Sequence, residues 1–123
     1  MENTFTLDRR TVGAVTILYL EGPLRLGYAD AATGQQLSDS VKQLLSAGTH
    51  LVALDLRGLL KTPDSSGLGE LVAAESALRK SGGGLVLVNV PTKLRDIIGL
   101  MRLDPLFRVV DTEEEALALL REG

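Results

Sequence analysis

The sequence predicts an α/β protein with a mixed, mostly parallel β-sheet, an N-terminal β-hairpin and about four helices. Two strand-like segments open the chain, helix-like and strand-like segments then alternate, and two later strands are short apolar runs bounded by turn residues. Strands that alternate with helices form parallel sheets through right-handed crossovers. The length of 123 residues suits a single domain over residues 1–123, with a core that needs neither metal nor disulfide.

The N-terminal third predicts a hairpin followed by a helix. Residues 5–9 alternate apolar and polar side chains, and residues 14–20 are rich in Val, Ile, Leu and Tyr. With Gly13 between them, the two segments are typical of a β-hairpin. The pair Gly22-Pro23 ends the second strand. Residues 29–46 then carry apolar side chains at helical spacing, and the glycine that follows at position 48 is a stop signal.

The middle of the chain predicts two buried parallel strands with a helix between them. The strands are the apolar runs Leu51–Leu56 and Leu85–Val90. The helix spans about Ser66–Arg79 and ends at the three glycines 82–84. Its buried stripe consists of Leu68, Leu71, Val72 and Leu78.

The C-terminal third predicts a helix, a short strand and a final helix. Pro91 and Thr92 open the first helix, and the strand is Phe107–Val110. Thr112 with Glu115 three residues later forms a capping box, which starts the final helix. The apolar faces are Leu94, Ile97, Ile98 and Met101 in the first helix and Ala116, Leu117, Leu119 and Leu120 in the second.

Composition excludes several classes of function. Aromatic residues make up 3% of the chain, which leaves few platforms on which nucleic-acid bases stack. A net charge of -3 argues against binding to a phosphate backbone. The chain has no cysteine, no secretory signal pattern and no apolar run of membrane-spanning length. We therefore expect a cytoplasmic protein without nucleic acid as partner and without direct membrane insertion.

The motif Asp64-Ser65-Ser66-Gly67-Leu68-Gly69 follows a buried strand and a short loop, and it opens a helix. At such a junction small polar side chains meet the unpaired N–H groups and the positive end of the helix dipole. A phosphate on a serine here is compatible with the local fold. A purely structural interpretation is also open, because Asp and Ser are favoured N-cap residues.

Nearly the full length of the chain resembles the STAS domain family, and within it the bacterial anti-sigma-factor antagonists. The resemblance rests on the Leu54-Asp55-Leu56 strand, the motif at residues 64–69 and the strand at residues 83–90. It also rests on Leu103-Asp104-Pro105-Leu106-Phe107 and the closing helix at residues 114–117. The order and spacing of these segments make the match specific.

The resemblance implies a regulator that binds an anti-sigma serine kinase while unphosphorylated. The kinase phosphorylates the first serine of the motif, matched here by Ser65, and the complex dissociates; a phosphatase resets the protein. Ser66 is the minor alternative site. The partner would then contact the residues of the motif, namely Asp64, Ser65, Ser66, Gly67, Leu68 and Gly69.

Two departures from the family pattern make the partner uncertain. Thr62-Pro63 stands where many members have two apolar residues, and Pro63 stiffens the loop. Arg25 stands where many members have an acidic residue close to the phosphorylation loop. Arg25 is a candidate partner-binding residue that could pair with Asp64 or a phosphate, and a solvated loop arginine is an equally open interpretation.

Leu100 is a further candidate for partner binding. It lies off the main apolar face of its helix, with Leu103 just beyond, and together they offer more apolar surface than a small core needs. The alternative is that both residues pack beneath the following loop.

We do not expect an enzyme. The only histidine, His50, precedes the strand Leu51–Leu56 and Ser65 follows it, so the two residues lie about 20 Å apart at opposite edges of the sheet. Asp55 lies inside that strand, and no second acidic cluster supports a metal site. The glycines at 82–84 follow a helix and precede a strand, the reverse of a phosphate-binding loop, so no motif asks for a cofactor.

A second function stays open at this point. A STAS-type module that is not a kinase substrate would act as a scaffold or as a transporter-associated subunit.

Overall fold

The computed structural model describes residues 6–22, 31–59 and 65–122. They form a five-stranded sheet in the order β1-β2-β3-β4-β5, in which β1 is antiparallel to β2 and the remaining pairs are parallel. The strands are β1 Thr6–Val12, β2 Val15–Gly22, β3 Leu51–Leu59, β4 Gly84–Val88 and β5 Arg108–Val110. The helices are α1 Ala31–Ser46, α2 Ser65–Lys80, α3 Thr92–Leu100 and α4 Glu113–Glu122. This arrangement confirms the predicted fold class.

The predicted opening hairpin is confirmed, and its turn has two residues. Val12 pairs with Val15, so Gly13 and Ala14 alone connect β1 and β2. Gly13 has a φ of 62°, and a glycine with positive φ at the first turn position suits the twist of a hairpin. β2 ends at Gly22, as predicted from the Gly-Pro pair.

Both edges of the sheet are protected against pairing with another strand. β1 carries three exposed charged residues in a row, Asp8, Arg9 and Arg10. β5 at the other edge has three residues. Charged or very short edge strands discourage edge-to-edge association.

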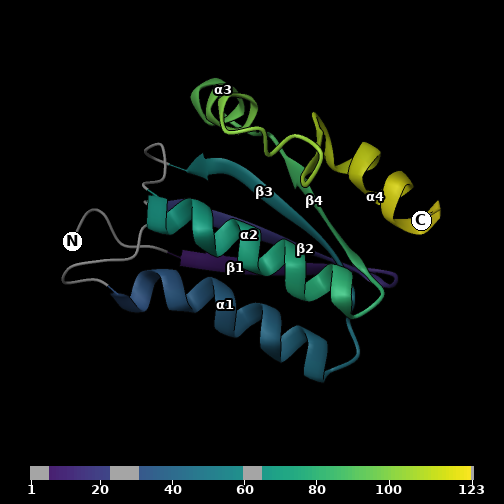
Figure 1. Ribbon diagram of the computed structural model, residues 1–123. Coiled ribbons are helices and arrows are strands. Elements are labelled where there is room, and N and C mark those ends of the chain that lie inside the picture. Colours follow the sequence, from purple (N-terminus) through teal and green to yellow (C-terminus); the bar gives the residue numbers. More distant parts are fainter. Residues whose placement is uncertain (1–5, 23–30, 60–64, 123) are drawn as a thin grey trace.

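The three parallel crossovers all step in the same direction along the sheet. Because each is right-handed, they place α1, α2 and α3 on one face. Figure 1 shows α1 and α2 running alongside each other across that face. The final helix α4 follows the last strand and packs against the opposite face, mainly over β3 and β4.

Alternate residues of the central strands enter two separate cores. Leu54 and Leu56 of β3 join Leu71 and Leu78 of α2 in the larger core. Ala53 of β3 lies in the smaller core with residues of β4 and α4. Both faces of β3 and β4 are therefore buried, as their apolar runs predict.

The glycines at positions 82–84 end α2, as predicted. Gly82 has a φ of 91°, and the N–H of Gly83 donates to the carbonyl oxygen of Leu78 at 3.0 Å. This pairing of a left-handed residue with a bond back into the last turn is a common helix stop. Gly84 then begins β4, with its N–H donating to the His50 carbonyl oxygen at 3.0 Å.

The predicted boundaries need correction at several places. β3 extends three residues beyond Leu56 to Leu59, and α2 begins at Ser65 rather than Ser66. β4 ends at Val88 rather than Val90, because Asn89 has a φ of 55° and leaves the extended conformation.

Met101 was wrongly predicted to share the buried face of α3. The helix ends at Leu100, so Met101 is its C-cap residue and is 54% exposed. Leu94 and Ile98 do lie in the core, and Ile97 packs against it.

Alanine substitutions at two glycines test this packing, because we expect them to change the free energy of unfolding in opposite directions. A Cβ at Gly83 would collide with the His50 carbonyl, and we expect Gly83→Ala to lower the free energy of unfolding by about 1–3 kcal/mol. A Cβ at Gly69, exposed on α2, meets nothing within 4 Å. Gly69→Ala should therefore raise the free energy of unfolding by up to about 1 kcal/mol. Denaturant unfolding followed by circular dichroism measures both, and equal effects of the two variants would contradict the assigned packing.

Candidate functional site

The carboxyl ends of β2, β3 and β4 lie at one edge of the sheet, because these strands are parallel. The chain leaves β3 at Leu59 and enters α2 at Ser65, so the N-terminus of α2 lies at this edge (Figure 1). Loops at the carboxyl edge of parallel strands are where α/β proteins commonly place functional residues. This edge is the candidate functional site.

The structure describes only part of the predicted motif. Asp64, Arg25 and Pro63 lie outside the described residues. Ser65 and Ser66 are the first two residues of α2, and their side chains also lie outside the described part. Gly67 and Leu68 are buried, with Leu68 in the larger core, whereas Gly69 is exposed. Leu68 therefore anchors the start of α2 from below.

The described part of α2 also carries a polar atom without a hydrogen-bond partner. Glu70 directly follows the last residue of the motif, and its Oε1 is buried and has no hydrogen-bond partner. The Glu70 side chain as a whole is half-buried.

Leu100 stands out at the end of α3. It is 82% exposed, and Leu100 and Met101 are the exposed large apolar side chains of the described part of the chain. Leu103, by contrast, packs against the larger core. The two residues therefore have different roles. Leu103 packs against the core, whereas Leu100 is exposed and accessible to another molecule. Beside them a hollow of about 290 Å³ lies between α3 and β5, lined by Arg95, Ile98, Gly99, Asp104, Phe107 and Val109.

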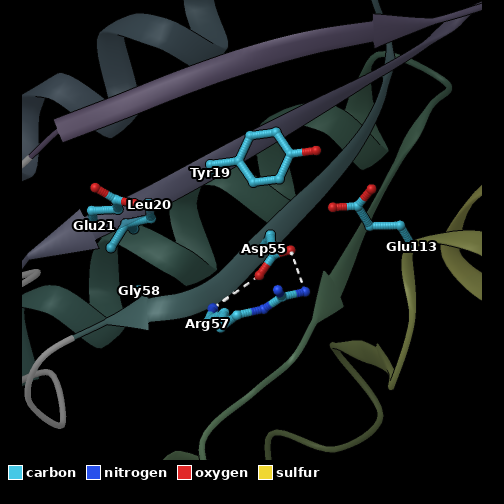
Figure 2. A pocket seen from close by; sticks show the side chains of 7 residues that line it. All are labelled: Tyr19, Leu20, Glu21, Asp55, Arg57, Gly58 and Glu113. Carbon is cyan, nitrogen blue, oxygen red and sulfur yellow. Dashed lines mark hydrogen bonds and ion pairs between the residues drawn. The ribbon is translucent and has the colours of Figure 1, made fainter.

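A second hollow lies on the α4 face of the same edge, with a volume of about 220 Å³. Figure 2 shows side chains from β2, β3 and the start of α4 around it. They are Tyr19, Leu20, Glu21, Asp55, Arg57, Gly58 and Glu113. The lining of the hollow thus includes three carboxylates and one guanidinium beside apolar groups.

A β-bulge shapes this hollow. Tyr19 pairs with Asp55 and Glu21 with Gly58, so β3 has one more residue than β2 in this interval. Gly58 lies against β2 so closely that a Cβ would approach the Leu20 carbonyl oxygen to 2.9 Å and the Glu21 Cγ to 2.7 Å. A glycine is therefore needed where the two strands converge.

The Asp55 carboxylate lines this hollow and is buried, with 3% of the residue exposed. Its Oδ1 accepts a hydrogen bond from the Arg57 backbone N–H at 2.9 Å. The Asn89 amide donates to Oδ1 and Oδ2 at 3.3 and 3.2 Å. The Arg57 guanidinium lies 3.9 Å away and is largely exposed (Figure 2). Asp55 is thereby satisfied by groups from β3 and from the residue that follows β4.

The sequence analysis missed this network. It placed Asp55 inside the strand and treated Asn89 as a strand residue. A buried aspartate in an otherwise apolar strand was the available signal, because a buried carboxylate requires hydrogen-bond donors. The sequence did not reveal which residue donates, because Asp55 and Asn89 are 34 positions apart in the chain.

His50 lies at the strand entrance where the sequence analysis placed it. His50 is exposed, and its Nδ1 lies 3.1 Å from Ser81 Oγ at the far end of β3 from α2's start. Within residues 6–22, 31–59 and 65–122, no group of three or more His, Cys, Asp or Glu side chains is arranged to hold a metal ion. In the same ranges, no helix has the length and apolar character to cross a membrane.

The chain matches a family model described as the STAS domain over residues 6–116. Solved structures also resemble it. An anti-sigma factor antagonist from Mycobacterium paratuberculosis is 22% identical, with a TM-score of 0.78 over 98% of this chain and 97% of that one. The phosphorylated form of the Bacillus cell fate determinant SpoIIAA is 21% identical, with a TM-score of 0.69 over 96% of this chain and 100% of that one.

An anion transporter contains the same fold. The murine Solute Carrier 26 family member A9 anion transporter is 20% identical, with a TM-score of 0.71 over 93% of this chain and 19% of the transporter. At these identities the three structures show a shared fold.

Tyr19 gives the site a measurable pH dependence. Burial, and then a hydrogen bond to Glu113, raise the pKa of Tyr19 above its ordinary value of 10.0. A raised folded-state pKa means that this contribution to stability is complete below the pKa of the unfolded tyrosine and is lost as pH rises through the folded value. We expect the wild type to lose more stability than Tyr19→Phe between about pH 8 and about pH 10.5, measured by denaturant unfolding. Glu113→Gln should give an intermediate loss, and parallel curves for all three proteins would contradict the assignment.

Proposed function

Because the chain belongs to the STAS domain family, we propose that it is an anti-sigma-factor antagonist controlled by phosphorylation. In this proposal residues 1–123 act as one STAS domain that binds an anti-sigma kinase when Ser65 is unphosphorylated. Phosphorylation releases the kinase, and a cognate phosphatase resets the protein. The observation that carries the proposal is the position of Ser65 as the first residue of α2, at the carboxyl edge of the sheet in a STAS fold.

The local physics at Ser65 suits a switch. A phosphoserine adds about -1.5 to -2 charges at neutral pH, and the N-terminus of a helix accommodates an anion through its free N–H groups and its dipole. The first turn of α2 contains no acidic residue, and Asp64 directly before it offsets only part of the favourable dipole interaction by like-charge repulsion. The domain would therefore stay folded while a neutral contact surface becomes anionic. A buried unpaired charge in an interface costs several kcal/mol, which is enough to dissociate a complex.

We further propose that the contact surface comprises Asp64–Gly69, Arg25 and Leu100. The 82% exposure of Leu100 supports its inclusion, because a large apolar side chain gains most when a partner removes it from water. The proposal treats the protein as cytoplasmic and non-enzymatic, with a kinase and a phosphatase as its partners. The net charge of -3 is consistent with a protein partner rather than nucleic acid.

A second candidate function is supported by the similarity to part of an anion transporter. In that case the chain would serve as a STAS module in a scaffold or beside a transporter, and no kinase would modify Ser65. The two candidates differ in one measurable property, namely phosphate uptake at the α2 entrance.

We expect Ser65 to be the phosphate acceptor. Incubating the protein with candidate anti-sigma kinases and ATP, followed by peptide mass spectrometry, should locate the phosphate on Ser65. Ser65→Ala should abolish uptake and leave thermal stability and kinase binding nearly unchanged, because the position lies at a helix start. Ser66→Ala is the matched control and should retain uptake. Phosphate found on Ser66 would contradict the residue assignment, and no uptake with any cognate kinase would favour the scaffold function.

We expect Leu100 to contribute to kinase binding. Leu100→Lys should leave the fold intact, since the side chain is already exposed, and should weaken binding by about tenfold, measured by titration calorimetry. Thr92→Lys at the exposed start of the same helix controls for the added charge. Unchanged affinity of a folded Leu100→Lys protein would remove Leu100 from the contact surface.

A further inference from the structure

The buried carboxylates of the described residues differ in what they connect. Glu75 of α2 pairs with Arg79 four residues later, at 3.3 Å, within its own helix. Asp55 instead joins β3 to the residue that follows β4, through the two hydrogen bonds from Asn89. Satisfying a buried carboxylate requires such donors, so the Asp55–Asn89 pair holds two segments together.

The pair lies where β3 and β4 separate. Their backbone register ends at Asp55 and Val88. Beyond this point β3 continues to Leu59 alongside β2, toward the segment that ends at Ser65. β4 ends, and the chain turns through Asn89 toward α3, which carries Leu100. The Asn89 amide is thus a side-chain connection just past the last backbone pair.

The Asn89 backbone N–H donates to the Val110 carbonyl oxygen of β5 at 3.4 Å. The start of α3 also has an exposed side-chain restraint, because the Arg95 guanidinium donates to Asp111 Oδ1 at 2.8 Å. The N-cap of α3 is Pro91, which makes no side-chain cap hydrogen bond.

Leu94 and Ile98 bury α3 in the larger core, but apolar contacts are not directional and define its position along the sheet less sharply than hydrogen bonds do. Asn89 itself has a φ of 55°, which asparagine tolerates better than most residues. Asn89 therefore provides both the backbone turn after β4 and the side-chain hydrogen bonds to Asp55.

We infer that Asp55 and Asn89 are positioning residues, which set α3 and its exposed Leu100 relative to the Ser65 entrance of α2. The functional meaning of this inference rests on the proposed function, because the two positioned elements are the two halves of the proposed contact surface. The positioning itself is a property of the fold and is measurable without any partner.

The absence of cysteine allows a direct measurement. Cysteines introduced at exposed Ala73 of α2 and exposed Asp96 of α3 accept spin labels at those two positions alone. Asn89→Gly removes the amide and keeps a residue that adopts positive φ freely. We expect it to broaden the distance distribution between the two labels. A control pair at Ala73 and exposed Lys42 of α1 should keep its distribution, since Asn89 does not connect these helices.

A reciprocal exchange tests the chemistry of the pair. The double variant Asp55→Asn with Asn89→Asp again places one carboxylate opposite one amide, and it should restore the narrow α2–α3 distribution. A distribution in folded Asn89→Gly that is as narrow as in the wild type would overturn the inference. If Asn89→Gly does not fold, Asp55→Ala decides in its place, because it removes both acceptor oxygens, and there too an unchanged distribution would overturn the inference.

The link to function is tested with the anti-sigma kinase that phosphorylates Ser65. We expect Asn89→Gly to weaken kinase binding about tenfold, the scale of losing hydrogen bonds to a charged group, and the reciprocal exchange to restore it. Gly83→Ala is the matched control, because it destabilises the opposite edge and should retain full affinity. Equal losses in both variants would mean that stability alone matters and would overturn the positioning role. If no kinase binds the wild type, the proposed function fails, and the label distances still decide the positioning inference.

Discussion

Right-handedness of the parallel crossovers is the constraint on which the rest of this structure depends. Since β2, β3, β4 and β5 follow one another in a single direction, their connecting helices collect on one face and leave the other to α4. The same geometry brings the carboxyl ends of the parallel strands to one edge. The β-bulge near Gly58, the Asp55 carboxylate and the start of α2 all lie at this edge. The candidate site is therefore a consequence of topology before it is a consequence of particular side chains.

The separation of the two cores suits a domain that must change its surface and keep its fold. Ser65 begins a helix that Leu68, Leu71 and Leu78 fix to the larger core. In the proposed function, a charge added at the first residue of that helix would act on the partner and would leave the apolar contacts below it in place. The proposed switch thus asks for no rearrangement of the sheet. The switch requires a rigid support beneath the start of α2, and the buried strands β3 and β4 provide that support.

Local signals predicted most of the fold. Gly13 marked the hairpin and Gly82 the end of α2, and Thr112 with Glu115 made the expected reciprocal bonds at 3.1 Å. The errors arose where long-range contacts override local pattern. Asn89 resembles a strand residue by its neighbours, but its left-handed backbone accompanies a bond to Asp55, which the local sequence does not reveal. Positions 100 and 103 are both leucine, so residue type does not distinguish them. Their different exposure follows from the end of α3 between them. The position of the motif at the α2 entrance was predicted from the local pattern, whereas its role as a phosphorylation site was predicted from family resemblance.

The protected edges of the sheet have a consequence for dosage. A regulator that acts by stoichiometric binding has to be present in amounts comparable to its partner, and an open strand edge would then favour pairing of copies with one another. The charges of β1 and the brevity of β5 remove that competing reaction. Backbone pairing is generic, whereas side-chain surfaces discriminate between partners. A domain with both edges protected is left with recognition through its side chains, and under the proposed function its abundance would not be limited by strand pairing between copies.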